Sequence, residues 1–410
     1  MKLLPLLAVK RLLLLAGLNV ALPCAAMALD LTLSGLTDLR LVAPSGQDSN
    51  LDGGLGKLSW GDGRGSPVIP DLDQAVLRGS ALFTPDLLAT AEIRYDPRQK
   101  TAVDLLDAYV RYRPVSTSRW RWGVRAGAFF PPVSLENTGI GWTPEWTLTP
   151  SAINAWVGEE LRTLGGETTL EWRGDVDRIE FTASAFGWNE PAGAAIASYG
   201  WTFNDRPTGL FDHLRMPDIF SAPGTTSWSD EFRQFDHSVG WYAGIAWDRP
   251  DIGRVALLRY DNEADPSAHD GGEFGWRTKF WSLSGSTEFG PVVILAQAMV
   301  GSTAIAPVPS YISTTEFWAY YVLAGIERGN WRYAIRFDHF GTTEVAPEPS
   351  PRGDEHGIAG TTAVTWTPRK GLSVVGELLA IDYNRAQRIL IGQPPHVTEV
   401  QAQLALRLSF

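Results

Sequence analysis

The C-terminal stretch of the chain, residues 397–410, alternates strictly between two kinds of side chain. One set is apolar and ends on an aromatic residue: Val400, Ala402, Leu404, Leu406, Leu408 and Phe410. The other set is polar or small: Glu399, Gln401, Gln403, Ala405, Arg407 and Ser409. A period of two is typical of a strand. A strand with one fully apolar face fits a transmembrane β-barrel, in which alternate residues meet lipid and lumen. Such a strand needs a partner on each edge, because lipid does not tolerate unpaired backbone groups.

The rest of the chain supplies those partners in segments of similar alternation. The predicted strands cover residues 29–41, 73–84, 87–96, 102–113 and 119–130, then pairs that flank turns at 173–177, 248–253, 288–291, 327–330 and 367–371, and finally 397–410. Every second connection is tight and most of the others are longer and polar, which is typical of bacterial barrels. We therefore predict an all-β fold, a transmembrane antiparallel up-and-down barrel of about sixteen strands. Fourteen or eighteen strands also fit the pattern.

Aromatic residues give an independent check on this prediction. The chain has 17 tryptophans, and barrels place such residues in girdles at the membrane interfaces. Outward aromatic positions lie within a few residues of the tight turns: Trp120, Trp122, Trp172, Trp247, Trp331, Tyr333 and Trp366. A soluble sandwich would need a second sheet to cover these faces, and its loops need not alternate in length. The barrel is therefore favoured.

The first 28 residues have the layout of a secretory signal peptide. A basic patch, Lys2, Lys10 and Arg11, precedes an apolar run over residues 12–22 and an Ala-Met-Ala motif at 26–28. The run is shorter than the roughly 20 residues of a spanning helix, and Pro23 makes Cys24 a poor lipoprotein site. We expect residues 1–28 to be cleaved and residues 29–410 to form a single barrel domain. The only cysteine, Cys24, would leave with the signal, so the mature chain would hold no disulfide.

Arginines are concentrated in the inward register of the third, fourth and fifth predicted strands: Arg94, Arg111, Arg113, Arg119, Arg121 and Arg125. Adjacent strands lie about 4.8 Å apart, so we expect a basic patch on one wall of the lumen. A guanidinium keeps its charge and offers a planar fork to carboxylates or phosphates. The four arginines near the turn also fit a solvated rim, whereas Arg94 and Arg125 lie deeper.

Other inward positions carry both signs: Glu167, Glu171, Glu180, Arg259, Arg277, Arg332, Arg336, Asp338, Glu377 and Arg407. A polar, mixed-charge interior fits a water-filled channel. The connection over residues 131–163 adds four acids, Glu136, Glu145, Glu159 and Glu160, and a short helix is expected after Ser151. Solvated surface acids are the alternative for these four. The longest connection, residues 189–238, is expected to be an extracellular loop.

Signals for other chemistry are absent from the sequence. The six histidines have no metal-ligand spacing, and no nucleophile elbow or sequential triad occurs. Residues 48–53 match only the first half of a calcium loop, and Ser59 stands where the bidentate Glu is required. A net charge of −11 argues against a nucleic-acid binder, which needs a basic surface. We predict no enzymatic activity, cofactor, metal or nucleic-acid partner.

Four segments carry a family resemblance: residues 51–57 (LDGGLGK), 127–132 (GAFFPP), 205–211 (DRPTGLF) and 406–410 (LRLSF). With them, the chain resembles Gram-negative outer-membrane porins, in particular the phosphate-selective porin O- and P-type superfamily. The resemblance implies a homotrimeric channel in contact with lipid and lipopolysaccharide. It also implies that Phe410 is an assembly signal read by the barrel-assembly machinery through the C-terminal strand. Lysine is almost absent after residue 28, so phosphate selectivity is not carried over.

The resemblance also bears on the loop over residues 131–163, because the third loop of general porins folds into the barrel. It makes this segment a candidate constriction loop, whose acids would face the arginine wall and set up a transverse field. The function expected is passive diffusion of small hydrophilic or ionic solutes through the outer membrane of a Gram-negative bacterium. An adhesin or receptor that acts through residues 189–238 is the alternative, and a barrel-scaffold enzyme is less favoured.

Overall fold

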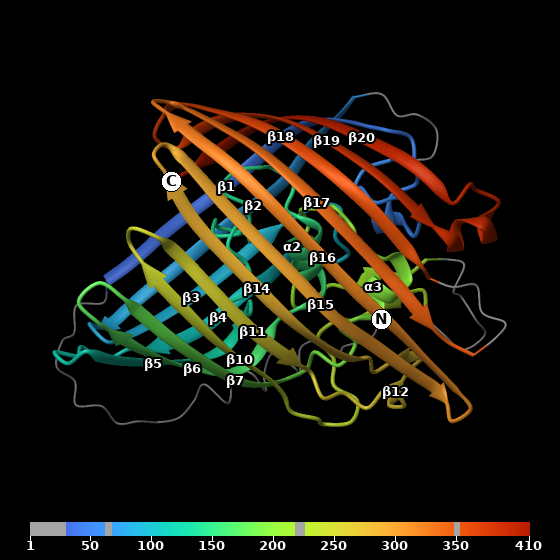
Figure 1. Cartoon of the computed structure of the whole chain (residues 1–410), viewed down its shortest axis with the longest axis horizontal. Coiled ribbons are helices and arrows are strands. Elements are labelled where there is room, and N and C mark those ends of the chain that lie inside the picture. Colours follow the sequence, from blue (N-terminus) through green and yellow to red (C-terminus); the bar gives the residue numbers. More distant parts are fainter. Residues whose placement is uncertain (1–29, 62–67, 218–225, 348–352) are drawn as a thin grey trace.

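Sixteen antiparallel strands close into one barrel (Figure 1). The computed structural model describes residues 30–61, 68–217, 226–347 and 353–410, so the predicted signal peptide, residues 1–28, lies outside the described residues. Each strand pairs with its neighbour in sequence around the ring. The first, β1 (Asp30–Pro44), pairs with the last, β20 (His396–Ser409), from Leu36↔Ser409 to Pro44↔Gln401. The predicted fold class is confirmed, and the strand number is sixteen.

The other barrel strands follow the sequence pattern closely, with shifts of a few residues at their ends. They are β2 (Ile69–Thr84), β3 (Leu87–Tyr95), β4 (Val103–Tyr112), β5 (Trp120–Phe129), β6 (Thr163–Arg173), β7 (Arg178–Gly187), β10 (Gly240–Arg249), β11 (Gly253–Asp261), β14 (Arg277–Phe289), β15 (Val292–Val308), β16 (Tyr311–Arg328), β17 (Trp331–Val345), β18 (Glu355–Arg369) and β19 (Leu372–Arg385).

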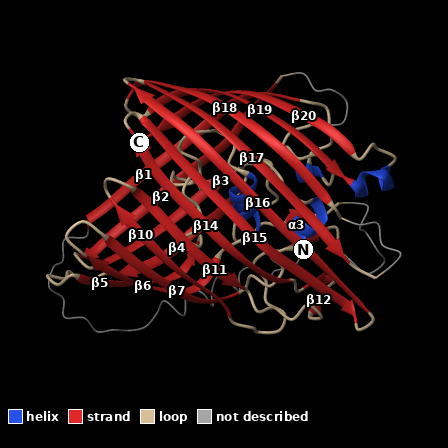
Figure 2. Cartoon of the chain, viewed as in Figure 1, coloured by secondary structure: helices blue, strands red, loops and turns tan. Residues whose placement is uncertain are grey.

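Helices and short hairpins lie in the connections between these strands. Helices α2 (Ala152–Glu160) and α3 (Ala194–Tyr199) lie within the ring of strands (Figure 2). The side chain of Ser151 accepts a hydrogen bond from the backbone N–H of Asn154 and so caps α2, the helix predicted there. The described ranges also contain the 3₁₀ turns η1 (Asn50–Asp52) and η3 (Ala386–Ile391). They contain the hairpins β8 (Leu214–Arg215) with β9 (Trp228–Ser229) and β12 (His269–Asp270) with β13 (Glu273–Phe274) as well. Among the described residues, no helix is long and apolar enough to cross a membrane.

The connections differ in length between the two ends of the barrel. At one end, here called the short-turn end, they are residues 85–86, 113–119, 174–177, 250–252, 290–291, 329–330 and 370–371. At the other, the long-loop end, they include residues 45–68, 130–162 and 188–239. The exception at the long-loop end is 309–310, a two-residue turn between β15 and β16, which are 17 and 18 residues long. The predicted alternation of tight and long connections is thus confirmed, with this exception.

The outward face of the barrel is apolar and carries two aromatic bands. In β20, Val400, Leu404 and Leu406 are exposed whereas Glu399 and Gln401 are buried, so the predicted register is confirmed. Exposed aromatic residues near the short-turn end include Trp120, Trp122, Trp331, Tyr333 and Trp366, and those nearer the long-loop end include Trp241 and Trp281. Two bands separated by aliphatic surface are the arrangement expected of a barrel in a bilayer.

Arg259 and Arg277 are corrections to the predicted register. Both were assigned to the lumen, but the side chains next to them in sequence, Leu258 and Tyr260 beside Arg259 and Thr278 beside Arg277, are the buried ones. The guanidinium of Arg259 instead lies over the exposed ring of Trp281, 5.4 Å from its centroid. Leu258, Tyr260, Thr278 and Phe280 fill the inward positions of these two strands, so the arginines lie on the opposite face.

The long-loop half of the lumen is packed rather than open. Trp156 of α2 is 1% exposed and contacts Phe280 and Phe317 of the wall, with ring centroids 5.6 and 5.2 Å apart. The ring centroid of Phe203, which belongs to the connection over residues 188–239, lies 5.5 Å from that of Phe340 in β17. The polar, mixed-charge interior expected from the sequence is therefore wrong for this half, where inward apolar residues hold the loops by burial.

Candidate functional site

A basic cavity lies in the lumen toward the short-turn end, along strands β4 to β7. The strand register builds it: Arg111 of β4 is paired directly with Arg125 of β5, and Arg125 in turn with Glu167 of β6. Arg121 lies directly opposite Glu171 of β6 in the strand register. Because side chains directly opposite in an antiparallel pair share one face, these residues meet on the inner wall. The cavity has a volume of about 410 Å³.

The charges that line this cavity are unbalanced. Its arginines are Arg111, Arg113, Arg121, Arg125, Arg173 and Arg178, and its acids are Glu167, Glu171 and Glu180. The excess is three positive charges. We call these six arginines the arginine wall. Arg173 and Arg178 were missed by sequence reasoning, although they flank the predicted 173–177 turn and the alternation of β6 and β7 could have identified them.

Only part of the arginine wall is neutralised locally. Arg125 donates to both carboxylate oxygens of Glu167, at 2.7 and 3.0 Å, and its guanidinium lies 3.8 Å from the centroid of the Phe129 ring. Arg173 pairs with Glu171, and Arg178 pairs with Asp248 at 3.0 Å. In the part of the chain that the structure describes, Arg111, Arg113 and Arg121 form no ion pair. These three side chains are therefore the ones able to bind or attract an anion.

Two of the predicted arginines lie away from this cavity. Arg94 is fully buried, donates to the backbone oxygen of Pro207 at 3.1 Å and pairs with Asp96 at 3.2 Å, so the connection over residues 188–239 covers it. The side chain of Arg119 is 60% exposed and pairs with Asp175 across neighbouring short turns. The structure thus brings together four of the six predicted arginines.

Glu136, the first predicted acid, contacts the wall opposite the arginines. Arg336 of β17 pairs with Glu136 at 3.3 Å and with Asp338 at 2.8 Å, and all three side chains are buried. Arg336 also donates to the backbone oxygens of Thr149 and Pro150, at 2.8 and 2.9 Å. This cluster, here called the Arg336 anchor, attaches the connection over residues 130–162 to β17.

Glu145 is the one predicted acid that lies at the short-turn end. It pairs with Arg332 at 3.4 Å and lines a second cavity of about 510 Å³. The other acids that line this cavity are Asp248, Asp251, Glu288 and Glu327. Glu327 belongs to β16, which lies seven strands from β5 in the ring of sixteen, almost diametrically opposite the arginine wall. Of these four acids, Asp251 lies in a short turn, and Asp248, Glu288 and Glu327 lie at strand ends within two residues of one. The sequence reasoning did not consider these positions.

Glu159 and Glu160 of α2 are buried and bind the connection over residues 188–239. Glu159 accepts hydrogen bonds from Asn204 and, at 3.1 Å, from Thr202. Glu160 accepts from the backbone N–H groups of Gly193 and Ala195, at 3.0 and 2.8 Å, beside the start of α3. Neither residue faces the arginine wall. Burial raises the pKa of Glu159 to about 8, although its two donors oppose the shift.

This raised pKa predicts how the packing of the two loops depends on pH. The folded state holds a proton on Glu159 that the unfolded chain releases near its ordinary pKa of 4.5. Stability is therefore lost as pH rises from about 4.5 through about 8, by at most about 1.4 kcal/mol per pH unit. Glu159→Gln, which carries no titrating proton, should be less sensitive to pH. The midpoint temperature of thermal unfolding, measured for both proteins between pH 5 and 9, checks this. A difference in midpoint between the two proteins that stays constant with pH would contradict it.

Similar anchors tie the other long connections to the inner wall. Arg40 of β1 pairs with Asp205, and Lys57 pairs with Glu355 of β18, whose carboxylate also accepts from Arg385 at 3.0 Å. Burial lowers the pKa of Lys57 to about 8, against the pull of Glu355. Sequence reasoning missed these anchors because an inward charge that binds a loop has the same register as one that faces water. No group of His, Cys, Asp and Glu in the described ranges could hold a metal ion.

The comparisons with known proteins find likeness in fold but not in sequence. No known family model and no curated protein matches the chain. The outer-membrane channel DcaP of Acinetobacter baumannii has a TM-score of 0.54 at 11% identity, over 93% of this chain and 97% of that one. OmpT, an outer membrane protein of Vibrio cholerae, has a TM-score of 0.52 at 8% identity, over 93% of this chain and 98% of that one. An anion-selective porin from Comamonas acidovorans has a TM-score of 0.50 at 12% identity, over 93% of this chain and 100% of that one. At such identities the likeness shows the barrel fold alone.

Proposed function

We propose that the protein is an outer-membrane channel of a Gram-negative bacterium through which small hydrophilic solutes diffuse passively. The observation that carries the proposal is the closed sixteen-strand ring with an apolar outer face and a charged cavity inside. Closure of the ring pairs the backbone N–H and C=O groups at every strand edge, and the apolar outer face is suited to lipid. The short-turn end would face the periplasm and the long-loop end the outside.

The path proposed for solutes runs between the arginine wall and the acids on the opposite side. Arg111, Arg121 and Arg125 lie on one side, and Glu145, Glu288 and Glu327 on the other. Such a separation of charge orients polar solutes across the path. The unpaired arginines support a preference for anions. Three of the acids first predicted to face them, Glu136, Glu159 and Glu160, act in this proposal as loop anchors that set the width of the path.

The assembly proposed is a homotrimer that forms through strands β2 to β7. Many of their outward positions are small along two cross-strand rows. One row includes Gly79, Ala91 and Ala108, and the other includes Ala81, Ala89, Ala126 and Gly166, with Val110 between Ala89 and Ala126. Small residues let neighbouring copies approach closely in lipid. A shallow groove of about 700 Å³ crosses this face beside Ala126 and Ala185. The remaining outer face would meet lipid and lipopolysaccharide.

The remaining features of the proposal concern export and ancestry. Residues 1–28 would be removed as a signal peptide, and Phe410 would be read by the barrel-assembly machinery. The exposed ring of Phe410 lies against Gly35, where a Cβ atom would come within 2.5 Å of it. Kinship with the porin O- and P-type superfamily is proposed on residues 51–57, 127–132 and 205–211. The alternative of an adhesin is less supported, because much of the connection over residues 188–239 is buried inside the barrel.

Conductance in planar lipid bilayers tests the channel function. Protein folded in detergent, checked by heat-dependent electrophoretic mobility, should insert and give discrete steps of current that rise linearly with voltage. The steps should be smaller than expected for an open ring of this size, because loops fill the long-loop half of the lumen. A folded protein that inserts but gives no steps would refute the channel function.

A further inference from the structure

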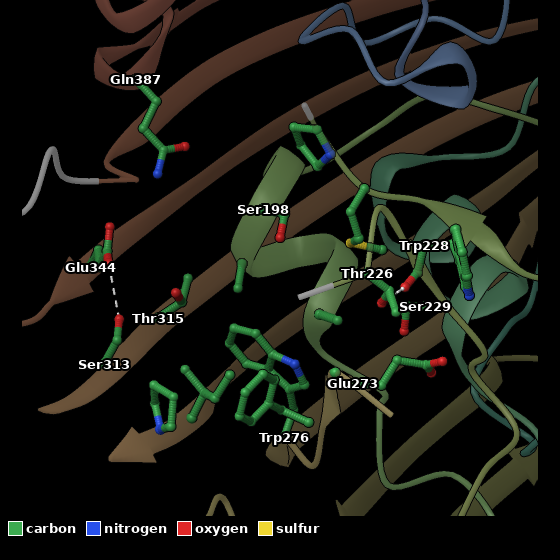
Figure 3. Close-up of a pocket in the computed structure, with 18 of the residues that line it drawn as sticks. Ser198, Thr226, Trp228, Ser229, Glu273, Trp276, Ser313, Thr315, Glu344 and Gln387 are labelled. Carbon is green, nitrogen blue, oxygen red and sulfur yellow. Dashed lines mark hydrogen bonds between the residues drawn. The ribbon is translucent and has the colours of Figure 1, made fainter. Parts of the chain in front are cut away.

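A third cavity opens at the long-loop end, on the far side of α3 from the packed loop core. It has a volume of about 560 Å³ and is bounded by α3, by β9, by residues 272–276 and by the ends of β15 and β16 that project beyond their neighbours. Figure 3 shows Gln387, Glu344 and Ser313 along one side of it and Thr226, Trp228 and Ser229 along another. The volume is in the range of pockets that bind small organic molecules.

The walls of this cavity are mainly apolar. Trp228, Phe274, Trp276 and Tyr311 supply aromatic surface, and Ile305 and Leu390 supply aliphatic surface. Hydroxyl groups of Ser198 and Thr315 lie among them. An apolar pocket with a few polar groups binds amphipathic molecules, because the apolar part supplies affinity and the polar groups fix orientation.

The charge of the cavity is negative and is not balanced from within. Among the described residues, two carboxylates line it, Glu273 and Glu344, and no lysine or arginine does. Glu273 is paired with Arg233 at 2.9 Å. Glu344 accepts hydrogen bonds from Ser313 at 2.9 Å and from the backbone N–H of Gly353 at 2.5 Å, both neutral donors. Within the described residues, Glu344 forms no ion pair. One carboxylate is therefore held in place beside an aromatic cavity without a cation.

We propose that this cavity is a binding site for an organic cation, an ammonium group attached to an aromatic or branched apolar body. The ammonium would pair with Glu344, and the body would lie against Trp276 and Tyr311. Aromatic faces attract cations and also bury apolar surface, so both parts of such a ligand gain from the site. Anions, which the arginine wall favours, would be repelled here. The site is independent of the proposed channel function, since it requires binding and not passage.

Equilibrium binding to the whole folded protein in detergent tests the proposal. The probes are 3-phenylpropylammonium, the neutral 3-phenylpropanol and the anionic 3-phenylpropionate, titrated by calorimetry against micelle blanks. We expect the ammonium probe to bind at least fivefold more tightly than the alcohol, and the carboxylate probe to bind most weakly. Equal affinity for the ammonium and the alcohol would overturn the assignment.

Substitutions test whether Glu344 causes the tighter binding of the ammonium probe. Glu344→Gln should remove most of the advantage of the ammonium probe and should improve binding of 3-phenylpropionate. Trp276→Leu should weaken both the ammonium and the alcohol. The matched control is Glu316→Gln, an exposed acid on the outward side of β16, paired with Thr343 next to Glu344 along β17. Ammonium binding that survives Glu344→Gln unchanged, in a variant that keeps its heat-dependent mobility, contradicts the site. Bilayer currents recorded on the same preparations report the channel function separately.

Discussion

Exchange of Arg111 and Arg121 for glutamate should shift the proposed channel from the anion preference inferred above to a preference for cations. Both side chains line the basic cavity and neither has an acidic partner among the described residues. The double substitution changes the cavity charge by four units, from an excess of three positive charges to one negative charge. A unit charge about 8 Å from a permeating ion contributes about 0.5 kcal/mol in water, so four units contribute about 2 kcal/mol before screening. Screening by salt leaves an expected fall in the anion-to-cation permeability ratio of about tenfold.

The measurement is the zero-current potential of single channels in a tenfold gradient of potassium chloride. Arg119→Glu is the matched control, since it makes the same chemical change on a side chain that is 60% exposed at a turn outside the cavity. Its zero-current potential should equal that of the unmodified protein. Arg125→Glu should have an intermediate effect that includes repulsion from Glu167, its partner at 2.7 Å. If the double variant conducts with an unchanged potential, the arginine wall does not lie on the path of ions.

Replacement of Arg336 by methionine should release the loop over residues 130–162 and raise the conductance several-fold. Arg336 is 1% exposed and makes ion pairs with Glu136 and Asp338, in addition to hydrogen bonds to two loop carbonyls. Methionine preserves much of the volume but leaves two buried acids without a counter-charge. Loss of one partner from a buried ion pair costs about 3–5 kcal/mol, and this cost falls on the contact between the loop and β17.

Two further variants separate this effect from general damage. Arg328→Met, at the exposed end of β16, removes an arginine without touching the anchor and should leave the current unchanged. A triple variant that adds Glu136→Gln and Asp338→Asn to Arg336→Met should recover most of the original conductance, because neutral partners no longer carry a buried charge. If Arg336→Met alone folds and conducts like the original protein, the loop is held by its apolar contacts and not by the Arg336 anchor.

The barrel could be predicted from the sequence because the membrane and ring closure leave few choices. Alternation with lipid fixes which side chains of β20 face outward, and a one-residue slip would expose Glu399 and Gln401 to lipid. Tight turns such as residues 329–330 then fix the register of the next strand. These constraints are local, so they can be recognised in a few consecutive residues.

The interior was less predictable because its contacts join residues far apart in the chain. Arg336 meets Glu136 and Lys57 meets Glu355, and no local pattern distinguishes either pair from charges that face water. Phe280 and Phe317 occupy inward positions that a water-filled lumen would give to polar residues, and only the folded loops explain them. The arginine wall was predicted in part, because Arg111 and Arg125 are brought together by adjacent strands alone.

The seam between β1 and β20 has a consequence for the order of folding. It joins Leu36 to Ser409, almost the full length of the chain, and the backbone of Phe410 exchanges hydrogen bonds with Gly35 at 3.1 and 3.2 Å. Contacts at such separation carry the largest loss of chain entropy and form slowly. Because β20 is part of the seam, the ring cannot close until synthesis has passed residue 410. Until then the edge of β1 stays unpaired, and an unpaired edge strand can pair with other copies of the chain.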